Sequence, residues 1–343
     1  DFRAFRNAYL RAAACGRAAR ALIDLGYATA MFVRWWRKQF WFRAPLRIWT
    51  GRNKRLGRLK RGRYTRGRYI INAAAAESGP LAEFIIQERF LNVPESARLD
   101  THNKRHRVYD FHMDEIDRDV VMKADWLNPD YRRRRQFNLW LHQLTSPNRA
   151  ARGFFGALHL ARAGIPSVTA LACWTHRVSP LLREDYFLYE KRPADRTLTN
   201  LLQAAAREHD TETATRLRHG MIEKLAKLVR RIHARGLRHE DIATGNFLVR
   251  DLGDAAGDAA DPARYELAVI DTDAVWLTRL RIPGLKRVLN MHSLRRLNLD
   301  REERRFFLRT LRGGKDSRFW FAVMEYFHRG GNRPLQSLLR RIR

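Results

Sequence analysis

The fold is decided by Gly236-Leu-Arg-His-Glu-Asp-Ile-Ala-Thr-Gly-Asn-Phe-Leu-Val249. This stretch places a carboxylate, Asp241, five residues before an amide, Asn246, and then continues as an apolar strand. A second apolar segment follows about twenty residues later and reads Leu267-Ala-Val-Ile-Asp-Thr-Asp273. Because an apolar strand can be buried while the residue at its end emerges, the pattern predicts oxygen-bearing side chains gathered at the rim of a cleft.

The spacing matches the catalytic loop His-x-Asp-x-x-x-x-Asn and the metal-binding Asp of protein-kinase-like enzymes. In such a site Asp241 would accept or orient the proton of an acceptor hydroxyl, and His239 would brace the loop. Asn246 and Asp271 would supply the oxygen ligands that Mg²⁺ requires beside nucleotide phosphates, with Asp273 assisting. A lone His-x-Asp is usually only a surface loop, but its combination with two apolar strands and a preceding amphipathic helix favours a phosphotransferase site.

The charge of the chain is concentrated near its start. The 343 residues carry a net charge of +31, and 45% are hydrophobic, enough for a sizeable core. Residues 1–69 hold 19 Lys and Arg against two Asp. Two cysteines, Cys15 and Cys173, lie too far apart to suggest a disulfide framework, which favours a reducing, cytoplasmic setting.

Residue types within this segment favour an anionic membrane surface. The apolar run 21–33 is shorter than the roughly twenty residues needed to cross a bilayer. Aromatic residues and cations alternate over 34–43, as in interfacial segments, and 52–68 is predicted to be a flexible basic strip. We therefore predict membrane contact through residues 1–69. A merely solvated extension is the alternative, and the absence of a nucleic-acid-binding motif argues against nucleic acid. The sequence shows no secretory signal pattern and lacks an initiating Met, which suggests a fragment.

The order of elements further along predicts a small sheet followed by helices. Residues 90–112 are expected to form hairpin strands, and Lys123 ends an apolar strand from which it could reach nucleotide phosphates. Residues 148–164 have the apolar spacing of a helix behind the cleft. Residues 186–191 are interpreted as a strand and hinge, with Glu190 at the position that would offer backbone groups to adenine; an ordinary core strand is the alternative.

A long helix is predicted to lead into the catalytic loop. Residues 211–235 present one apolar face, with Thr211 or Thr213 as N-cap and Gly236 as the C-terminal stop. Between the two site strands, the acidic, Gly-rich segment 251–262 is interpreted as an exposed hairpin insertion. Its Asp spacing does not fit a calcium-binding loop, which needs a central Gly and a terminal Glu.

Three segments together resemble the bacterial lipopolysaccharide core kinase family, which includes Kdo and heptose kinases: residues 236–249, residues 269–273, and Ser146-Pro-Asn-Arg-Ala-Ala-Arg-Gly-Phe-Phe-Gly-Ala-Leu-His-Leu-Ala-Arg-Ala-Gly-Ile-Pro166. The resemblance implies an α+β, two-lobed protein-kinase-like fold and an ATP- and Mg²⁺-dependent enzyme, peripheral on the cytoplasmic face of the inner membrane. It implies a sugar hydroxyl of the lipopolysaccharide core, or of another acidic glycolipid, as acceptor. On matching positions, Asp241 would be the catalytic Asp, Asn246 and Asp271 the metal ligands, and Lys123 the nucleotide lysine.

The corresponding division is a basic, membrane-interfacial extension over 1–80, an N-lobe over 81–192 and a C-lobe over 193–343. The chain departs from the kinase pattern, since no Gly lies between Gly79 and Gly153 and no acid within 148–164 could pair with Lys123. A Glu elsewhere in the chain is expected to substitute. A kinase for a protein or small-molecule hydroxyl, and a pseudokinase that acts as a membrane scaffold, are therefore the alternatives to a lipopolysaccharide kinase.

Overall fold

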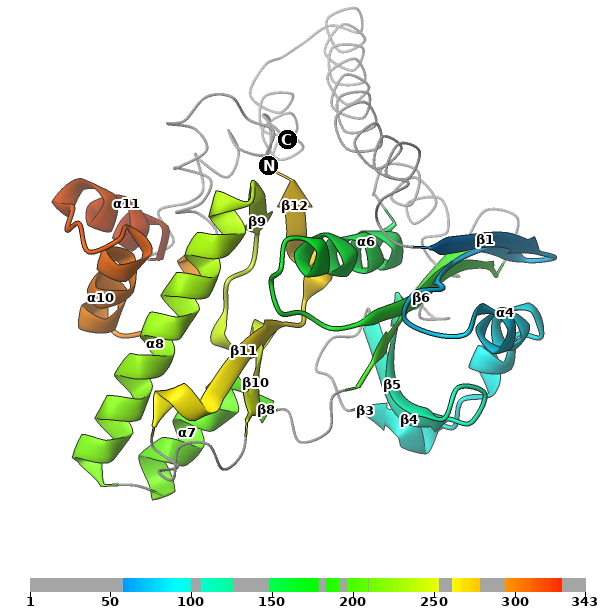
Figure 1. Cartoon of the computed structure of the whole chain (residues 1–343), viewed down its shortest axis with the longest axis horizontal. Coiled ribbons are helices and arrows are strands. Elements are labelled where there is room, and N and C mark those ends of the chain that lie inside the picture. Colours follow the sequence, from blue (N-terminus) through cyan, green and yellow to red (C-terminus); the bar gives the residue numbers. More distant parts are fainter. Residues whose placement is uncertain are drawn as a thin grey trace, which may run out of the picture.

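The computed structural model of the chain describes residues 58–99, 106–125, 148–178, 183–191, 196–208, 210–252, 261–277 and 294–328. These residues form a sheet lobe and a mainly helical lobe, with helix α6 lying between them (Figure 1). The fold is the predicted two-lobed α+β, kinase-like arrangement. The predicted apolar run and the aromatic, basic segment within residues 1–57 lie outside the described residues.

The sheet lobe is built on seven strands that pair in the order β1-β2-β6-β7-β5-β4-β3, each antiparallel to its neighbour. Helix α4 covers one face of this sheet, and α6 contacts the other (Figure 1). The bounds are β1 (Leu59–Tyr64), β2 (Gly67–Asn72), α4 (Ser78–Ile86), β3 (Arg98–Leu99), β4 (His106–Met113), β5 (Arg118–Asp125), α6 (Arg149–Arg162), β6 (Ala170–Arg177) and β7 (Arg183–Glu190).

Strict alternation along the central strands fills both faces of the sheet. Met122 and Leu188 belong to the apolar cluster under α4, whereas their neighbours Val121 and Phe187 belong to the cluster under α6. Successive side chains of a strand point to opposite faces, so strands buried on both sides read as continuous apolar runs. Strands β5 and β7 are thereby packed on both faces, and Lys123 lies near the end of β5.

The helical lobe has one continuous core, with α8 running through it and α10 and α11 on its outer side (Figure 1). Its elements are β8 (Arg196–Thr197), α7 (Leu198–Glu208), α8 (Thr211–Ala234), β9 (Leu237–His239), β10 (Phe247–Asp251), β11 (Tyr265–Val269), β12 (Val275–Leu277), α10 (Arg301–Leu311) and α11 (Arg318–His328). Helix α8 confirms the predicted long helix, but its N-cap is Asp210, whose carboxylate accepts a hydrogen bond from the Thr213 N–H at 2.9 Å. An Asp satisfies an open N–H of the first turn as well as a Thr does.

Two sequence interpretations are corrected by the sheet. Residues 90–97 are not hairpin strands: they form the short 3₁₀ turns η2 (Arg89–Asn92) and η3 (Glu95–Ala97), because the left-handed Glu88 and then Pro94 interrupt an extended chain. The predicted antiparallel strands of this region begin only at Arg98, where β3 pairs with β4, and β4 pairs in turn with β5. Likewise, the described part of the basic strip, residues 58–68, is not simply flexible, since it contains β1 and the start of β2, which pair and extend the sheet beyond β6. The sheet lobe thus begins at least as early as Leu59.

The insertion predicted between the site strands is a hairpin connection, since β10 and β11 pair antiparallel from Phe247 opposite Val269 to Asp251 opposite Tyr265. Residues 253–260 of that connection lie outside the described part. Within the described ranges, the helices are all too short or too polar to cross a bilayer.

Candidate active site

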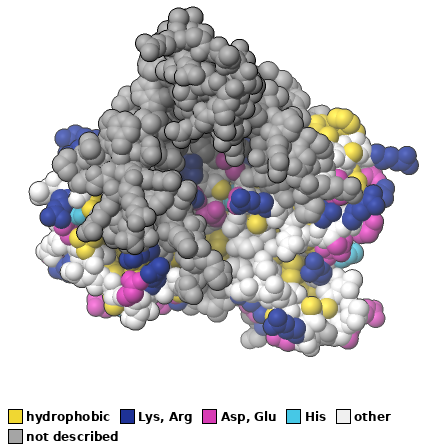
Figure 2. Space-filling model, turned by 180° about the vertical axis from the view of Figure 1, so that it is seen from behind, with side chains coloured by type: hydrophobic (Ala, Val, Ile, Leu, Met, Phe, Trp, Pro, Cys, Tyr) yellow, Lys and Arg dark blue, Asp and Glu magenta, His cyan; other side chains and the backbone are white. Residues whose placement is uncertain are grey.

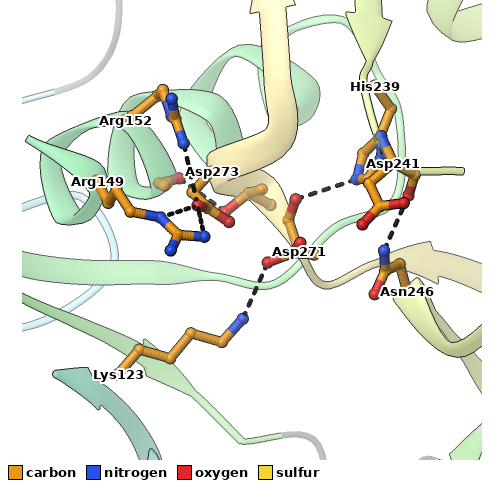
Figure 3. Close-up of polar contacts among 10 residues, drawn as sticks. Lys123, Arg149, Arg152, His239, Asp241, Asn246, Asp271 and Asp273 are labelled. Carbon is orange, nitrogen blue, oxygen red and sulfur yellow. Dashed lines mark hydrogen bonds and ion pairs between the residues drawn. The ribbon is translucent and has the colours of Figure 1, made fainter. Parts of the chain in front are cut away.

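A cavity of about 390 Å³ lies where the two lobes meet. All the predicted site residues line it except His239 and Glu190. They come from β5, the loop after β9, the turn before β10 and the segment after β11, and Figure 3 shows them converging from these separate elements. On the face in Figure 2, acidic and basic side chains lie next to one another near the middle of the molecule. The predicted residues are thus brought together by the tertiary structure.

The catalytic loop is fixed by hydrogen bonds to its own backbone. The Asn246 side-chain N–H donates to the Asp241 carbonyl at 2.8 Å, which closes the loop over five residues. His239 is fully buried, and its Nδ1 accepts from the Asp241 N–H at 3.3 Å. Its Nε2 therefore carries the proton and donates to the Asp271 carbonyl at 3.0 Å (Figure 3). Burial lowers the pKa of His239, so the imidazole is neutral. His239 braces the loop, as predicted, and holds it against Asp271 without lining the cavity.

Lys123 pairs with a carboxylate, but this carboxylate does not lie on α6, the helix on which a kinase usually carries it. Its ammonium lies 3.4 Å from Asp271 Oδ1, across 148 residues of sequence, and 5.8 Å from the centre of the Tyr189 ring. Burial alone would lower the pKa of Lys123, but Tyr189 and Asp271 outweigh it and raise the pKa. The carboxylate paired with Lys123 is therefore an Asp, Asp271, and not the Glu that the sequence analysis expected.

Helix α6 faces the site with the opposite charge to that expected of a kinase helix. Arg149 and Arg152 donate to Asp273 Oδ2 at 2.8 Å and 3.2 Å (Figure 3). Burial would raise the pKa of Asp273, but its hydrogen bond with Asp271 and the two guanidinium groups hold it well below its usual range. The sequence analysis noted only that this helix has no acidic residue, and it gave the two arginines no role. Their i, i+3 spacing, which puts both on one helical face, is the signal that could have indicated a shared carboxylate partner.

Gly156 lets α6 approach the segment that carries Asp271 and Asp273. The Thr272 hydroxyl donates to the Gly153 carbonyl at 2.8 Å. A Cβ atom at Gly156 would lie 2.2 Å from the Thr272 carbonyl oxygen, far inside van der Waals contact. The missing side chain of Gly156 therefore allows direct contact between the helix and the backbone of η7 (Thr272–Ala274).

The donor set at the cavity fits a divalent cation. Asn246 uses its amide nitrogen on Asp241, which leaves its carbonyl oxygen available as a ligand. Burial and the neighbouring Asp273 raise the pKa of Asp271 despite Lys123, so a further cation would favour its ionised form. Asp241 Oδ1 is buried and has no hydrogen-bond partner among the described residues. The amide oxygen of Asn246 and the carboxylate oxygens of Asp271 and Asp241 are hard ligands of the kind that suits Mg²⁺. The role of Asp273 in metal binding stays a prediction, because its observed partners are the two α6 arginines.

Glu190 ends β7, opposite Val120 of β5, and lies outside the residues that line the cavity. Its N–H donates to the Thr169 carbonyl at 3.0 Å, and its carboxylate lies 3.7 Å from Arg118. Its role at a hinge stays a prediction. The sequence reading missed several charged cavity residues besides Arg149, and two of them stand out. One is Asp185, whose pKa is raised to about 7 chiefly by burial. The other is Arg296, which binds Asp241.

The antiparallel sheet lobe, the loop with Asp241 and Asn246, and the Lys123–Asp271 pair define a kinase-type phosphotransferase. The chain belongs to the family described as the "Lipopolysaccharide kinase (Kdo/WaaP) family", whose sequence profile matches residues 116–309, more than half of its length. Membership makes it an ATP-dependent phosphotransferase with an alcohol group as acceptor.

Two solved structures are similar to parts of this chain. One is described as "WaaP in complex with acyl carrier protein"; it is 19% identical, with a TM-score of 0.48, over 71% of this chain and 91% of that chain. The other, "Crystal structure of BubR1 kinase domain", is 14% identical, with a TM-score of 0.34, over 60% of this chain and 61% of that one. None of the curated proteins compared is significantly similar.

Proposed function

We propose that this protein transfers the γ-phosphoryl group of ATP to a hydroxyl of Kdo or heptose in the inner core of lipopolysaccharide. One observation carries the proposal. Lys123, Asp241, Asn246 and Asp271 come from four separate elements and line one cavity. The family supports a lipopolysaccharide acceptor, and the site chemistry supports an in-line transfer to a hydroxyl oxygen.

The residues would divide the reaction as follows. The acceptor hydroxyl gives its proton to Asp241 while its oxygen forms a bond to the γ-phosphorus. The bond from that phosphorus to the bridging oxygen breaks, and ADP leaves with the electron pair. Lys123 would stabilise the charge of the nucleotide phosphates. Mg²⁺, held by Asn246 and Asp271, would neutralise phosphate charge when bound. His239 keeps the loop and Asp271 in register throughout.

An anionic membrane surface on the cytoplasmic side is part of the proposal. The hairpin β1–β2 lies at the edge of the sheet, and its exposed cations are well placed for lipid headgroups. Such a surface would bring the enzyme to an acceptor held in the inner leaflet. The exposed cations are Arg58, Lys60, Arg61, Arg63, Arg66 and Arg68.

The transfer is tested with the full chain, Mg·ATP and lipopolysaccharide from which core phosphates have been removed. Mass spectrometry of the product should show one added phosphate on a Kdo or heptose residue. Asp241→Asn should abolish the transfer while nucleotide binding persists. Asp271→Asn should abolish the rise in melting temperature that Mg·ATP gives the wild type. A wild type that binds Mg·ATP but phosphorylates neither sugar would reject this acceptor, and one that does not bind it would favour a pseudokinase scaffold.

The membrane contact is tested by sedimentation of the full chain with vesicles that contain phosphatidylglycerol. Replacing Lys60, Arg61 and Arg63 by Gln should weaken binding and reduce its salt dependence. The matched control replaces three exposed arginines of the helical lobe, which removes the same charge elsewhere: Arg207, Arg230 and Arg235. Equal loss of binding in both triple variants would show that net charge alone, and not this hairpin, attracts the vesicle.

A further inference from the structure

An arginine that the reaction scheme does not use lies directly on the catalytic carboxylate. Arg296 donates from Nη1 to Asp241 Oδ2 at 2.6 Å, and both side chains line the cavity. The Arg296 side chain is 61% exposed, whereas that of Asp241 is 22% exposed. The arginine therefore reaches the acid from the solvent side, which is the side from which an acceptor must enter.

The backbone that presents Arg296 is firmly anchored. Arg296 ends the short turn η8 (Leu294–Arg296). Leu294 and Leu297, on either side of it, are completely buried in the core of the helical lobe. The Leu297 N–H also donates to the Leu294 carbonyl at 3.0 Å. Because its backbone is fixed and its side chain is exposed, Arg296 can exchange one hydrogen-bond partner for another without a change in the backbone.

The position of Arg296 differs from that of the other cavity cations. Lys123 and Arg149 bind Asp271 and Asp273, the carboxylates on the nucleotide side. Arg296 instead binds Oδ2 of Asp241, whose other oxygen is buried. Oδ2 is therefore the oxygen that an incoming hydroxyl can reach, and Arg296 stands next to where that hydroxyl must bind.

We propose that Arg296 recognises an oxyanion, a carboxylate or a phosphate, carried by the acceptor sugar beside its reactive hydroxyl. A guanidinium offers five N–H donors in a planar fork, which binds carboxylate and phosphate in bidentate fashion. One donor holds Asp241, and the side chain that carries the fork lines the cavity. When the acceptor's anion binds Arg296, its hydroxyl is brought to Asp241 Oδ2. Arg296 is thus a specificity residue for acidic sugars, and this inference rests on the proposed function.

The test uses the full chain with Mg·ADP and compares acceptor binding by isothermal titration. Three oligosaccharide acceptors are needed: a Kdo-containing core fragment, the same fragment with its carboxyl groups reduced to alcohols, and the reduced fragment carrying a phosphate. Arg296→Gln should weaken binding of an anionic fragment about tenfold to a hundredfold, the range expected for a lost charge-assisted hydrogen bond. Binding of the reduced fragment should change little. Loss confined to the carboxylate or to the phosphate fragment identifies which oxyanion is read.

Two further variants separate recognition from structure. Arg296→Lys keeps the charge but loses the fork, so it should restore only part of the affinity. Arg305→Gln is the control, because Arg305 is also an exposed arginine paired with an acid, Asp316, at 2.9 Å, yet lies outside the cavity. Equal effects of Arg296→Gln on the reduced and anionic fragments, or none on either, would overturn the proposal. Because binding is measured without turnover, absent phosphoryl transfer would reject the proposed function and leave this result intact.

Discussion

Replacement of Gly156 by Ala should damage catalysis much more than stability. The new methyl group would lie 2.2 Å from the Thr272 carbonyl oxygen and 3.1 Å from its carbon, where ordinary contact begins at 3.4 Å. The obstacle is backbone, so no side chain can rotate away. Helix α6 and η7 must therefore separate by about 1 Å, which matches the difference between those distances.

The two consequences differ in size. Overpacking costs about 1–3 kcal/mol, and the better helix propensity of Ala offsets up to about 1 kcal/mol of this. The same displacement moves Asp273 away from Arg152 and takes Asp271 with it, since one short segment carries both. A misplacement of about 1 Å at reacting groups can lower the rate about a hundredfold. We expect kcat to fall by about that factor, with a loss of about 2 kcal/mol or less in unfolding free energy.

Steady-state phosphoryl transfer and urea unfolding measure the two quantities. Gly79→Ala is the matched control, because Gly79 also lies in a helix, α4, but a Cβ there meets nothing within 4 Å. That variant should keep wild-type activity and be as stable as the wild type or slightly more so. If Gly156→Ala behaves like Gly79→Ala in both assays, the close approach of α6 does not position the site.

Three further perturbations follow from the buried polar groups. His239→Ala should lower kcat by up to about a hundredfold with little change in the KM for ATP, since it frees the catalytic loop from Asp271; an unchanged kcat in steady-state kinetics would contradict this. Burial raises the pKa of Asp185 to about 7, so the folded state holds a proton that the unfolded chain releases above about pH 4. Stability should therefore fall as the pH rises from about 4 to 7, and Asp185→Asn should flatten that slope in thermal unfolding; a slope equal to the wild type's would refute the assignment. Arg304→Met should cost about 3–5 kcal/mol in urea unfolding, because it removes the guanidinium that donates to the buried Glu325 at 2.6 Å, and adding Glu325→Leu should recover much of the loss.

Much of the site was predictable because it is local in sequence. Asp241 and Asn246 are separated by five residues, and the apolar strand that follows fixes both by covalent geometry and burial. Helix α6 was likewise predictable from its apolar spacing and its C-terminal Gly164, which adopts φ +68°. Short-range patterns of this kind depend only on backbone periodicity, so one sequence is enough to recognise them.

The early sheet strands were less predictable. In β1, Arg and Lys alternate with Gly and Tyr in a way that equally suits a solvated strip. Pairing with β2, and of β2 with β6 about a hundred residues away, decides that this segment is extended. Hydrogen bonds to a strand that is distant in the sequence stabilise the extended segment, and its own amino-acid composition does not indicate them.

The sequence by itself determined the class of chemistry, because the type and spacing of Asp241, Asn246 and Asp271 are properties of short contiguous segments. Only the tertiary structure decided which charges meet. Lys123 binds Asp271 across 148 residues, the α6 arginines take Asp273, and Arg296 reaches Asp241 across 55 residues. These pairings depend on how closely separate elements can pack, as at Gly156, where a Cβ would prevent the close approach. The spacing of residues within a short segment does not determine packing distances between segments that are remote in sequence.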